Sequence, residues 1–325
     1  MSLPELRRRE RPESFSSILL KTALLLGLIA VIAVGVSWSF GWVAIEQPSR
    51  DELFSKILDG RRDLRRAAAI EWSRRLVSAE ERGREDEVAE WRPQGDEALK
   101  LQSAFGTERI EALEVGEGPY LSGVAQILSF SSETAASART LCGWLGQVRE
   151  GQLVDAQVFV VLGLGRLARV EPAALCEPLL AKASDPDPAI RKSVAFVLGL
   201  AERNSALGER RAEVLEILRR LHASAEEDVR WNAAFSAALW RDPMGRDLLS
   251  LLLDEGLAGG QGGGPVLDAF RLQAIESAIA AALRLEDSDL HGKVERIARE
   301  SPSLKLRQAA VARLKASSSK PDPKK

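Results

Sequence analysis

Apolar and polar residues recur with helical spacing along much of the chain, and residues 185–200 show the pattern most clearly. Asp185 and Pro186 are typical of a turn followed by the start of a helix. After them, apolar residues return at the three- and four-residue intervals that place side chains on one helix face: Ile190, Val194, Val197 and Leu198. This spacing predicts an amphipathic helix with one buried stripe.

An apolar residue followed directly by arginine marks this helix, and the same pair returns along the chain. The pairs are Ile190-Arg191, Val229-Arg230, Phe270-Arg271, Leu306-Arg307 and an early copy, Leu64-Arg65. From Ile190 the apolar anchors advance by 39, 41 and 36 residues. Helical units of this period stack on their neighbours, because no unit buries its apolar face alone. The pattern predicts an all-α protein, an α-solenoid of stacked helical hairpins.

The repeat array is expected to cover residues 135–316. Its predicted helices are 135–148, 154–169, 175–183, 190–203, 212–222, 229–241, 247–257, 267–285, 290–300 and 304–315. Gly163 and Gly165 predict a close approach of the second of these helices to a neighbour. Residues 317–325 are polar and contain proline, and we expect a disordered tail.

The region before the array is less regular. Residues 46–134 are expected to hold a first repeat, with helices at 52–58 and 61–78, followed by an irregular helical segment in which the pattern lapses. Insertions in repeat proteins lie on one face and often serve binding. The irregular segment is therefore a candidate for binding without any evident chemistry.

These repeats resemble HEAT repeats, and their short spacing is most similar to the HEAT-like repeats of the phycobilisome-lyase type. The resemblance covers residues 150–316 and extends to 51–78. It implies that the second helix of each hairpin lines the inner side of the array. It also implies that the recurring arginine braces neighbouring repeats through acidic residues in the turns: Asp185, Asp187 or Asp228. Such motifs specify architecture and say little about activity.

A second feature lies near the N-terminus, where residues 22–45 carry no charged side chain. About 20 apolar residues suffice to cross a hydrocarbon core about 30 Å thick, so we expect a single transmembrane helix. Trp38 and Trp42 fit an aromatic belt at one membrane interface. A cleaved signal peptide is the alternative, but the apolar run is long and lacks a small-residue cleavage site.

The orientation of this span follows from the charges around it. The basic tail 1–21 favours a cytoplasmic N-terminus, although arginines soon after the span weaken the contrast. We therefore expect the repeats outside the cytoplasm, in the periplasm if the source is a bacterium.

Composition agrees with a folded helical protein. Hydrophobic residues make up 45% and charged residues 28% of the chain, and a net charge of −2 gives no overall attraction to nucleic acid. Cys142 and Cys176 are the two cysteines, too few for a disulfide-rich scaffold or a four-cysteine zinc site. Two buried free thiols are expected. A disulfide between the two is the alternative, if the domain faces an oxidising compartment.

Residues that carry catalytic or metal chemistry are sparse. His222 and His291 are the two histidines, and neither has a partner at metal-ligand spacing. The glycine-rich stretch 256–265 lacks the lysine and the preceding strand of a phosphate-binding loop, so we expect a linker. No serine lies in a nucleophile elbow, and Cys142 has no nearby base. The sequence therefore predicts neither catalysis, nor a cofactor, nor a metal.

Binding residues are more readily proposed. Evenly spaced guanidinium groups could hold an acidic or phosphate-bearing partner, and Trp231 beside Arg230 is expected to be a surface anchor. The candidate protein-binding residues are Arg191, Arg230, Trp231, Arg271 and Arg307, with the bracing of neighbouring repeats as the alternative role of the arginines.

The helix predicted at 61–78 also carries a cluster of arginines close to the expected membrane span. The cluster could rest on anionic lipid. The alternative is a solvated face paired with the acidic residues of 80–87.

These features together predict a single-pass, membrane-anchored repeat protein that presents a surface to a protein partner as a scaffold or adaptor. One alternative is a lyase-like or enzyme-assisting protein, which requires a deep pocket with convergent polar groups. A second is nucleic-acid binding on a basic surface, against which the neutral net charge and the membrane anchor count.

Overall fold

The computed structural model describes residues 48–105, 117–149, 151–259 and 268–318. The chain divides into two compact units, Met1–Ser49 and Arg50–Lys325, and all the helices below belong to the second. Every regular element in the described residues is a helix, which confirms the all-α class.

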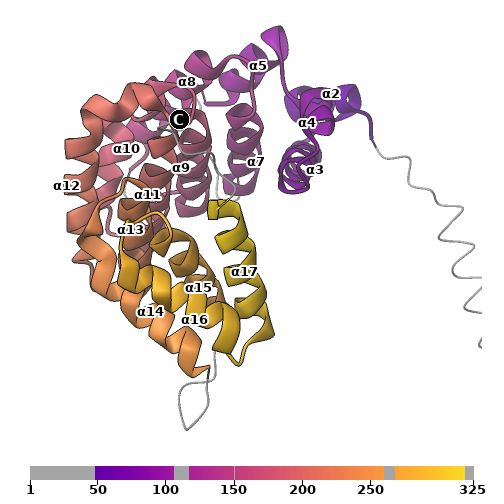
Figure 1. The fold of residues 1–325 in the computed structure, drawn as a ribbon. Helices are drawn as coiled ribbons and strands as arrows, with labels where there is room; N and C mark the ends of the chain where they lie inside the picture. Colours follow the sequence, from indigo (N-terminus) through magenta and orange to yellow (C-terminus); the bar gives the residue numbers. More distant parts are fainter. Residues whose placement is uncertain (1–47, 106–116, 150, 260–267, 319–325) are drawn as a thin grey trace, which may run out of the picture. The chain divides into compact units, whose positions relative to one another are not determined.

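Figure 1 labels the α-helices. Their bounds are α2 (Arg50–Asp59), α3 (Arg62–Glu81), α4 (Glu85–Trp91), α5 (Gly95–Gln102), α7 (Gly118–Ser129), α8 (Thr134–Gln147), α9 (Val154–Ala168), α10 (Glu177–Ala181), α11 (Pro188–Leu200), α12 (Arg211–His222), α13 (Glu227–Leu239), α14 (Arg246–Ala258), α15 (Ala269–Ala282), α16 (Ser288–Glu300) and α17 (Leu304–Ser318). Short 3₁₀ helices lie between them at η1 (Ser103–Phe105), η2 (Pro172–Ala174), η3 (Lys182–Ser184), η4 (Ala201–Arg203), η5 (Ser205–Arg210) and η6 (Pro243–Gly245).

Helix starts follow the turn chemistry of the sequence. The Asp187 side chain accepts a hydrogen bond from the Ala189 backbone N–H at the start of α11, and Pro188 occupies the first helical position, where a missing N–H costs nothing. Asp268 caps α15 and Asp287 caps α16 in the same way. Because each cap satisfies backbone donors that the helix leaves free, these residues fix where the helices begin.

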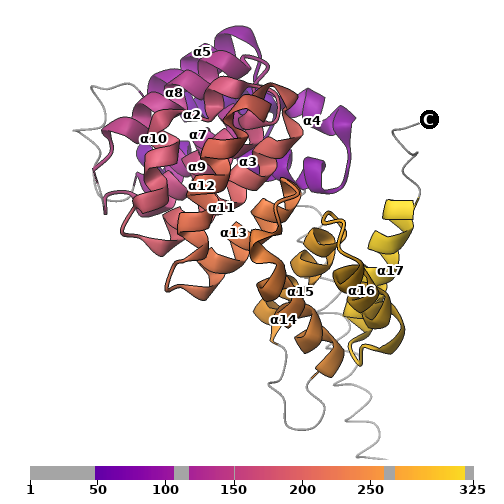
Figure 2. The same ribbon diagram turned by 60° about the vertical axis from the view of Figure 1, so that its left-hand side comes forward.

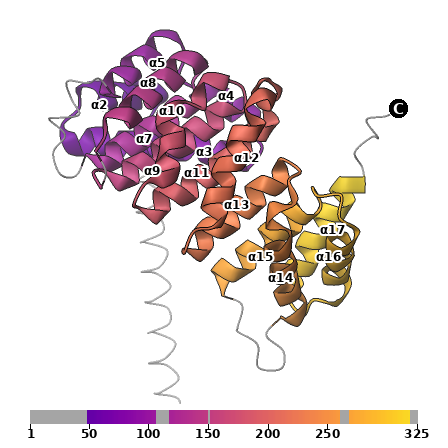
Figure 3. The ribbon, with the colours of Figure 1, turned by 90° about the vertical axis from the view of Figure 1, so that its left-hand side faces the viewer.

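One series of helices packs in chain order. Each member of the series α3, α7, α9, α11, α13, α15 and α17 contacts the next. The helices α2, α8, α12, α14 and α16 pack against α3, α9, α13, α15 and α17, respectively. Figures 2 and 3 show α9, α11 and α13 following one another, with α12 lying against α13.

Glycines allow the closest approaches within this series. A Cβ atom on Gly165 of α9 would fall 2.4 Å from a methyl carbon of Val197 on α11, and one on Gly199 of α11 would fall 2.5 Å from Ser236 Oγ on α13. A Cβ on Gly163 would approach a backbone oxygen of α7 at 3.2 Å. The close packing expected at Gly163 and Gly165 is confirmed.

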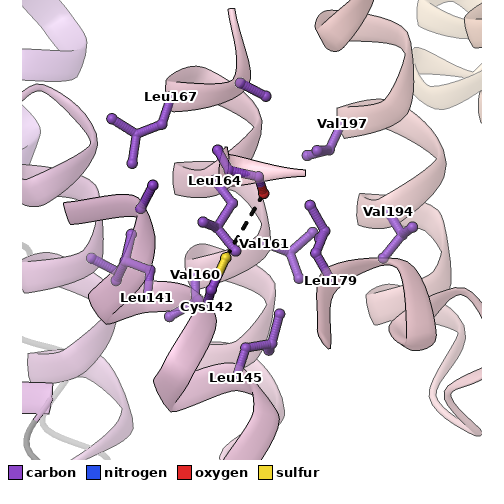
Figure 4. Close-up of a cluster of buried hydrophobic side chains, with 14 of the residues drawn as sticks. Leu141, Cys142, Leu145, Val160, Val161, Leu164, Leu167, Leu179, Val194 and Val197 are labelled. Atoms are coloured by element: carbon purple, nitrogen blue, oxygen red, sulfur yellow. Dashed lines mark hydrogen bonds between the residues drawn. The ribbon is translucent and has the colours of Figure 1, made fainter. Parts of the chain in front are cut away.

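Two apolar clusters form the core. One extends from Leu53 to Trp240, and the other extends from Trp231 to Ala310. Figure 4 shows part of the first, where side chains of α8, α9, α10 and α11 point toward one another. Because α13 contributes Val229 to the first cluster and Trp231 to the second, this helix joins the two.

Cys142 on α8 and Cys176, which precedes α10, form a disulfide with their Cα atoms 6.3 Å apart. The expectation of two free thiols was therefore wrong. Cys142 Sγ also lies 3.9 Å from the Ala174 carbonyl oxygen (Figure 4), a contact rather than a hydrogen bond, since a disulfide sulfur carries no proton. The disulfide links α8 to the N-cap residue of α10.

The ends of the chain bear on two further expectations. Among the described residues, no helix is long and apolar enough to cross a membrane. The predicted span at 22–45, with Trp38 and Trp42, lies outside the described residues, as does the basic tail 1–21. At the other end α17 extends to Ser318, so the first two residues of the expected tail 317–325 are helical instead.

Candidate binding groove

A groove of about 610 Å³ lies along the described helices α9, α11, α13, α15 and α17. The residues that line it occur at fixed distances in the sequence from the apolar anchors. The third residue after each apolar anchor contributes Ser193, Asn232 and Gln273, and the sixth contributes Phe196, Phe235 and Glu276. We call this feature the aromatic groove. Equivalent positions of the sequence pattern on α11, α13 and α15 therefore line one groove.

The wall of the aromatic groove is aromatic and partly open to solvent. Phe196 on α11 is 45% exposed and Phe270 on α15 is 49% exposed. Phe270 occupies an anchor position, and the equivalent residues Ile190, Val229 and Leu306 are fully buried. Phe270 therefore departs from the buried state of the other three anchors. A large aromatic ring held in solvent at a normally buried position favours a binding role over a packing role.

Neighbouring side chains hold the Phe270 ring in place. The Trp231 ring lies 5.4 Å from it, centroid to centroid, and Lys192 Nζ lies 5.5 Å from its centroid. Lys192 is itself paired with Asp228 at 3.2 Å. Because these contacts come from α11 and α13, they restrict the rotation of a side chain that begins on α15. Little conformational entropy then remains to be lost when a ligand covers the ring.

Trp231 lies beneath this surface. Its side chain is only 2% exposed, so the expectation of a surface anchor was wrong. The Arg271 guanidinium lies 4.8 Å from the Trp231 ring centroid and forms ion pairs with Glu227 at 2.8 Å and Glu255 at 2.7 Å. The hydrogen bonds that Arg271 donates to the Glu255 carboxylate raise the pKa of Arg271 above its usual range. Arg271 thus closes over Trp231 and links α13, α14 and α15.

The other recurring arginines donate hydrogen bonds to backbone carbonyl groups in the turns of the chain. Arg191 donates to the carbonyl oxygens of Asp185 and Pro186 at 2.7 and 2.8 Å. Arg230 repeats this geometry with Ser224 and Ala225 at 2.9 and 2.6 Å. Arg307 donates to the equivalent carbonyl of Ser301. These bonds satisfy carbonyl groups in the turn before each helix and account for the recurrence of arginine in structural terms, while partner binding by these arginines stays a prediction.

The early copy of the motif differs. Leu64 is 40% exposed and does not act as a buried anchor, contrary to the sequence pattern. Arg65 pairs with Glu117 at 3.1 Å and lies over the Tyr120 ring. The first pair in the chain therefore connects α3 to α7 without the turn contacts seen later.

Two acidic residues of the run 80–87 pair with arginines outside the cluster of α3. Glu80 pairs instead with Arg166 and Arg169 of α9, and Glu87 pairs with Arg82 and Arg84. Glu80 and Glu87 therefore do not make the pairs that the solvated-face interpretation expects of them. Contact of the cluster with lipid stays a prediction.

In the described residues, no group of three or more histidine, cysteine or acidic side chains is placed to hold a metal ion. Neither His222 nor His291 lines the aromatic groove. No protein-family model matches the chain, and no curated protein matches it in sequence.

Sequence reasoning missed Phe196, Phe235, Gln273 and Arg313 as lining residues. A signal for two of them was present, because Phe196 and Phe235 both follow their apolar anchors by six residues. Two phenylalanines at equivalent positions outside the buried stripe indicate a shared surface. Arg313 carried no such signal, since only the packing of α17 against α15 brings it to the groove.

Proposed function

We propose that the chain is a non-catalytic scaffold of HEAT-like repeats that binds a partner protein in the aromatic groove and is held at a membrane by residues 22–45. The observation that carries the binding role is the exposed Phe270 ring, fixed by Trp231 and Lys192 where other repeats bury their anchor. Aromatic side chains that are exposed yet rigid are typical anchors of protein interfaces.

The repeat interpretation has support of its own. Consecutive contacts along α3, α7, α9, α11, α13, α15 and α17 support an α-solenoid, in which each unit is expected to touch its neighbours. Turn-directed bonds from Arg191, Arg230 and Arg307 recur at equivalent positions. This repeated hydrogen-bond geometry supports the proposal that the helices form repeats.

The location of the domain is proposed on two grounds. The uncharged run 22–45 favours a membrane anchor with the repeats outside the cytoplasm. The Cys142–Cys176 disulfide favours the same side, because disulfides persist in oxidising compartments and are rare in the cytosol.

Site-directed photocrosslinking tests the binding role. A benzophenone amino acid placed at Gln273, an exposed residue of the groove, should crosslink to a partner protein in native membranes. The matched position is Glu209, which is exposed on η5 and does not line the groove. We expect a discrete crosslinked species from position 273 that Phe270→Ala abolishes. Equal crosslinking from both positions would refute the proposed site.

A further inference from the structure

The charged side chains that line the aromatic groove differ in whether they have an ion-pair partner. Lys192 is paired with Asp228 at 3.2 Å, and Glu276 is paired with Lys305 at 2.8 Å. Arg313 is exposed and has no ion pair or hydrogen bond within the described part of the chain. As far as the described residues go, the groove therefore presents the positive charge of Arg313 without an ion-pair partner beside an aromatic wall.

This combination restricts what binds there. Apolar side chains are required to cover Phe196 and Phe270, and a carboxylate is required to pair with Arg313, because a guanidinium recognises carboxylates through two parallel hydrogen bonds. No strand edge is available among the described elements for a peptide to extend as a sheet. Insertion of an amphipathic helix meets both requirements, because a helix places apolar side chains on one face and an acidic side chain beside them. A polyproline II segment is the other mode that an aromatic groove admits, and selection of proline-rich peptides in the experiment below would identify it instead.

We propose, building on the protein-binding function above, that the aromatic groove receives an amphipathic helical segment of the partner, with apolar residues on one face and an Asp or Glu beside them. Phe196 and Phe270 contact the apolar face. Arg313 pairs with the carboxylate and sets the direction in which the helix lies. Arg271 takes no part, because Glu227 and Glu255 already engage its guanidinium.

A random peptide library of about 16 residues per member, long enough for about four helical turns, tests this chemistry. The library is displayed on phage and selected against the full chain in detergent. We expect enrichment of apolar residues at three- and four-residue spacing together with Asp or Glu. Affinity of the best selected peptide should fall at least about tenfold in Phe270→Ala and in Arg313→Glu, the loss typical of an interface anchor.

The matched control is Arg220→Glu, which reverses an exposed arginine on α12 outside the groove and should leave affinity unchanged. A second variant pair isolates the ionic contact. Replacing the acidic residue of the peptide by Lys should weaken its binding to the unmodified chain. The same Lys peptide should bind the Arg313→Glu variant more tightly than the acidic peptide does. Circular dichroism of each variant shows whether the fold is retained.

Three outcomes overturn the inference. Selected peptides without acidic residues refute the charge requirement, as does unchanged affinity in Arg313→Glu. A bound amphiphile that is seen by native mass spectrometry and blocks all peptide selection identifies the groove as a lipid site instead. None of these results depends on the crosslinking from position 273, so a failure here leaves the scaffold role to be judged separately.

Discussion

Arg191 Nη2 donates a hydrogen bond of 2.7 Å to Glu226 Oε2, although the two residues are 35 positions apart in the sequence. Glu226 lies in the turn before α13, and its carboxylate also accepts a bond of 2.6 Å from Ser224 Oγ. The same arginine holds the turn before α11 through Asp185 and Pro186. One guanidinium therefore ties together the starts of two successive helices.

Glu226→Gln should weaken this connection. Hydrogen bonds from Ser224 and Arg191 lower the pKa of Glu226 from 4.5 to about 2, so folding favours the ionised form. A lowered folded-state pKa contributes stability above the unfolded value of 4.5, and the contribution is lost as pH falls through about 2. We expect the variant to unfold at lower urea concentration near neutral pH and to converge with the unmodified protein as pH falls through this window.

The control for this variant is Glu216→Gln, which removes an exposed pair with Arg219 inside a single helix. Exposed pairs of this kind contribute little to stability. A difference between Glu226→Gln and the unmodified protein that stays constant between pH 4.5 and about 2 would contradict the role of the ionised carboxylate.

Gly199→Ala should destabilise the contact between α11 and α13. The added methyl group would fall 2.5 Å from Ser236 Oγ and 2.8 Å from Ser236 Cβ, so the helices must move apart. Overpacking of this kind costs about 1–3 kcal/mol. Gly143→Ala on α8 is the matched substitution, because its methyl group meets no atom within 4 Å. Thermal unfolding should show a lower midpoint temperature for Gly199→Ala and an unchanged or slightly higher one for Gly143→Ala.

Removal of the disulfide should lower stability through the unfolded state. Cys142 and Cys176 enclose a loop with a sequence separation of 34, and closing a loop of that size stabilises the folded protein by roughly 3–4 kcal/mol in the chain-entropy account. The double variant Cys142→Ser, Cys176→Ser should therefore unfold at lower denaturant concentration than the oxidised protein. Added reductant should lower the midpoint of the unmodified protein and leave the double variant unaffected. Insensitivity of both proteins to reductant would contradict the prediction.

The sequence predicted the helices well because their causes are local. Pro188 and the apolar stripe from Ile190 located α11 within two residues of its observed start. The pattern could not separate a buried anchor from an exposed one, so Phe270 was taken as equivalent to Ile190. Its exposure depends on how α15 packs against α13, which is a property of three-dimensional arrangement.

The candidate site shows the same division between local and tertiary causes. The pairing of Cys142 with Cys176 depends on a Cα separation of 6.3 Å that no spacing rule supplies. Trp231 was expected at the surface from its residue type, but Arg271 and Phe270 cover it. Arg313 entered the site only through the position of α17.

Membrane attachment through residues 22–45 is tested by deleting residues 1–45. We expect the full chain to stay in the membrane pellet after carbonate extraction and the truncated chain to be released, because an apolar helix of this length partitions into the bilayer. A reporter that is active only in the cytoplasm should be inactive when fused after Lys325. Activity of that fusion would reverse the proposed orientation while leaving the attachment itself intact.

Trp231→Ala and Phe270→Ala should separate packing from binding at the aromatic groove. Trp231 is 2% exposed within the second apolar cluster, so truncation leaves a cavity and costs about 3–5 kcal/mol. Phe270 is 49% exposed, and its truncation removes mostly solvated surface, so we expect a loss of about 1 kcal/mol or less. Urea denaturation measures both values.

When partner binding is compared at equal folded fraction, Phe270→Ala should cause the larger loss and Trp231→Ala the smaller one. Phe270→Ala removes the exposed ring, whereas Trp231 supports that ring from below at 5.4 Å. Trp231→Phe keeps an aromatic support and should retain crosslinking from position 273. A large stability loss in Phe270→Ala, without loss of crosslinking, would show that the ring serves packing, and the groove would then lose the feature that distinguishes it from an ordinary helix junction.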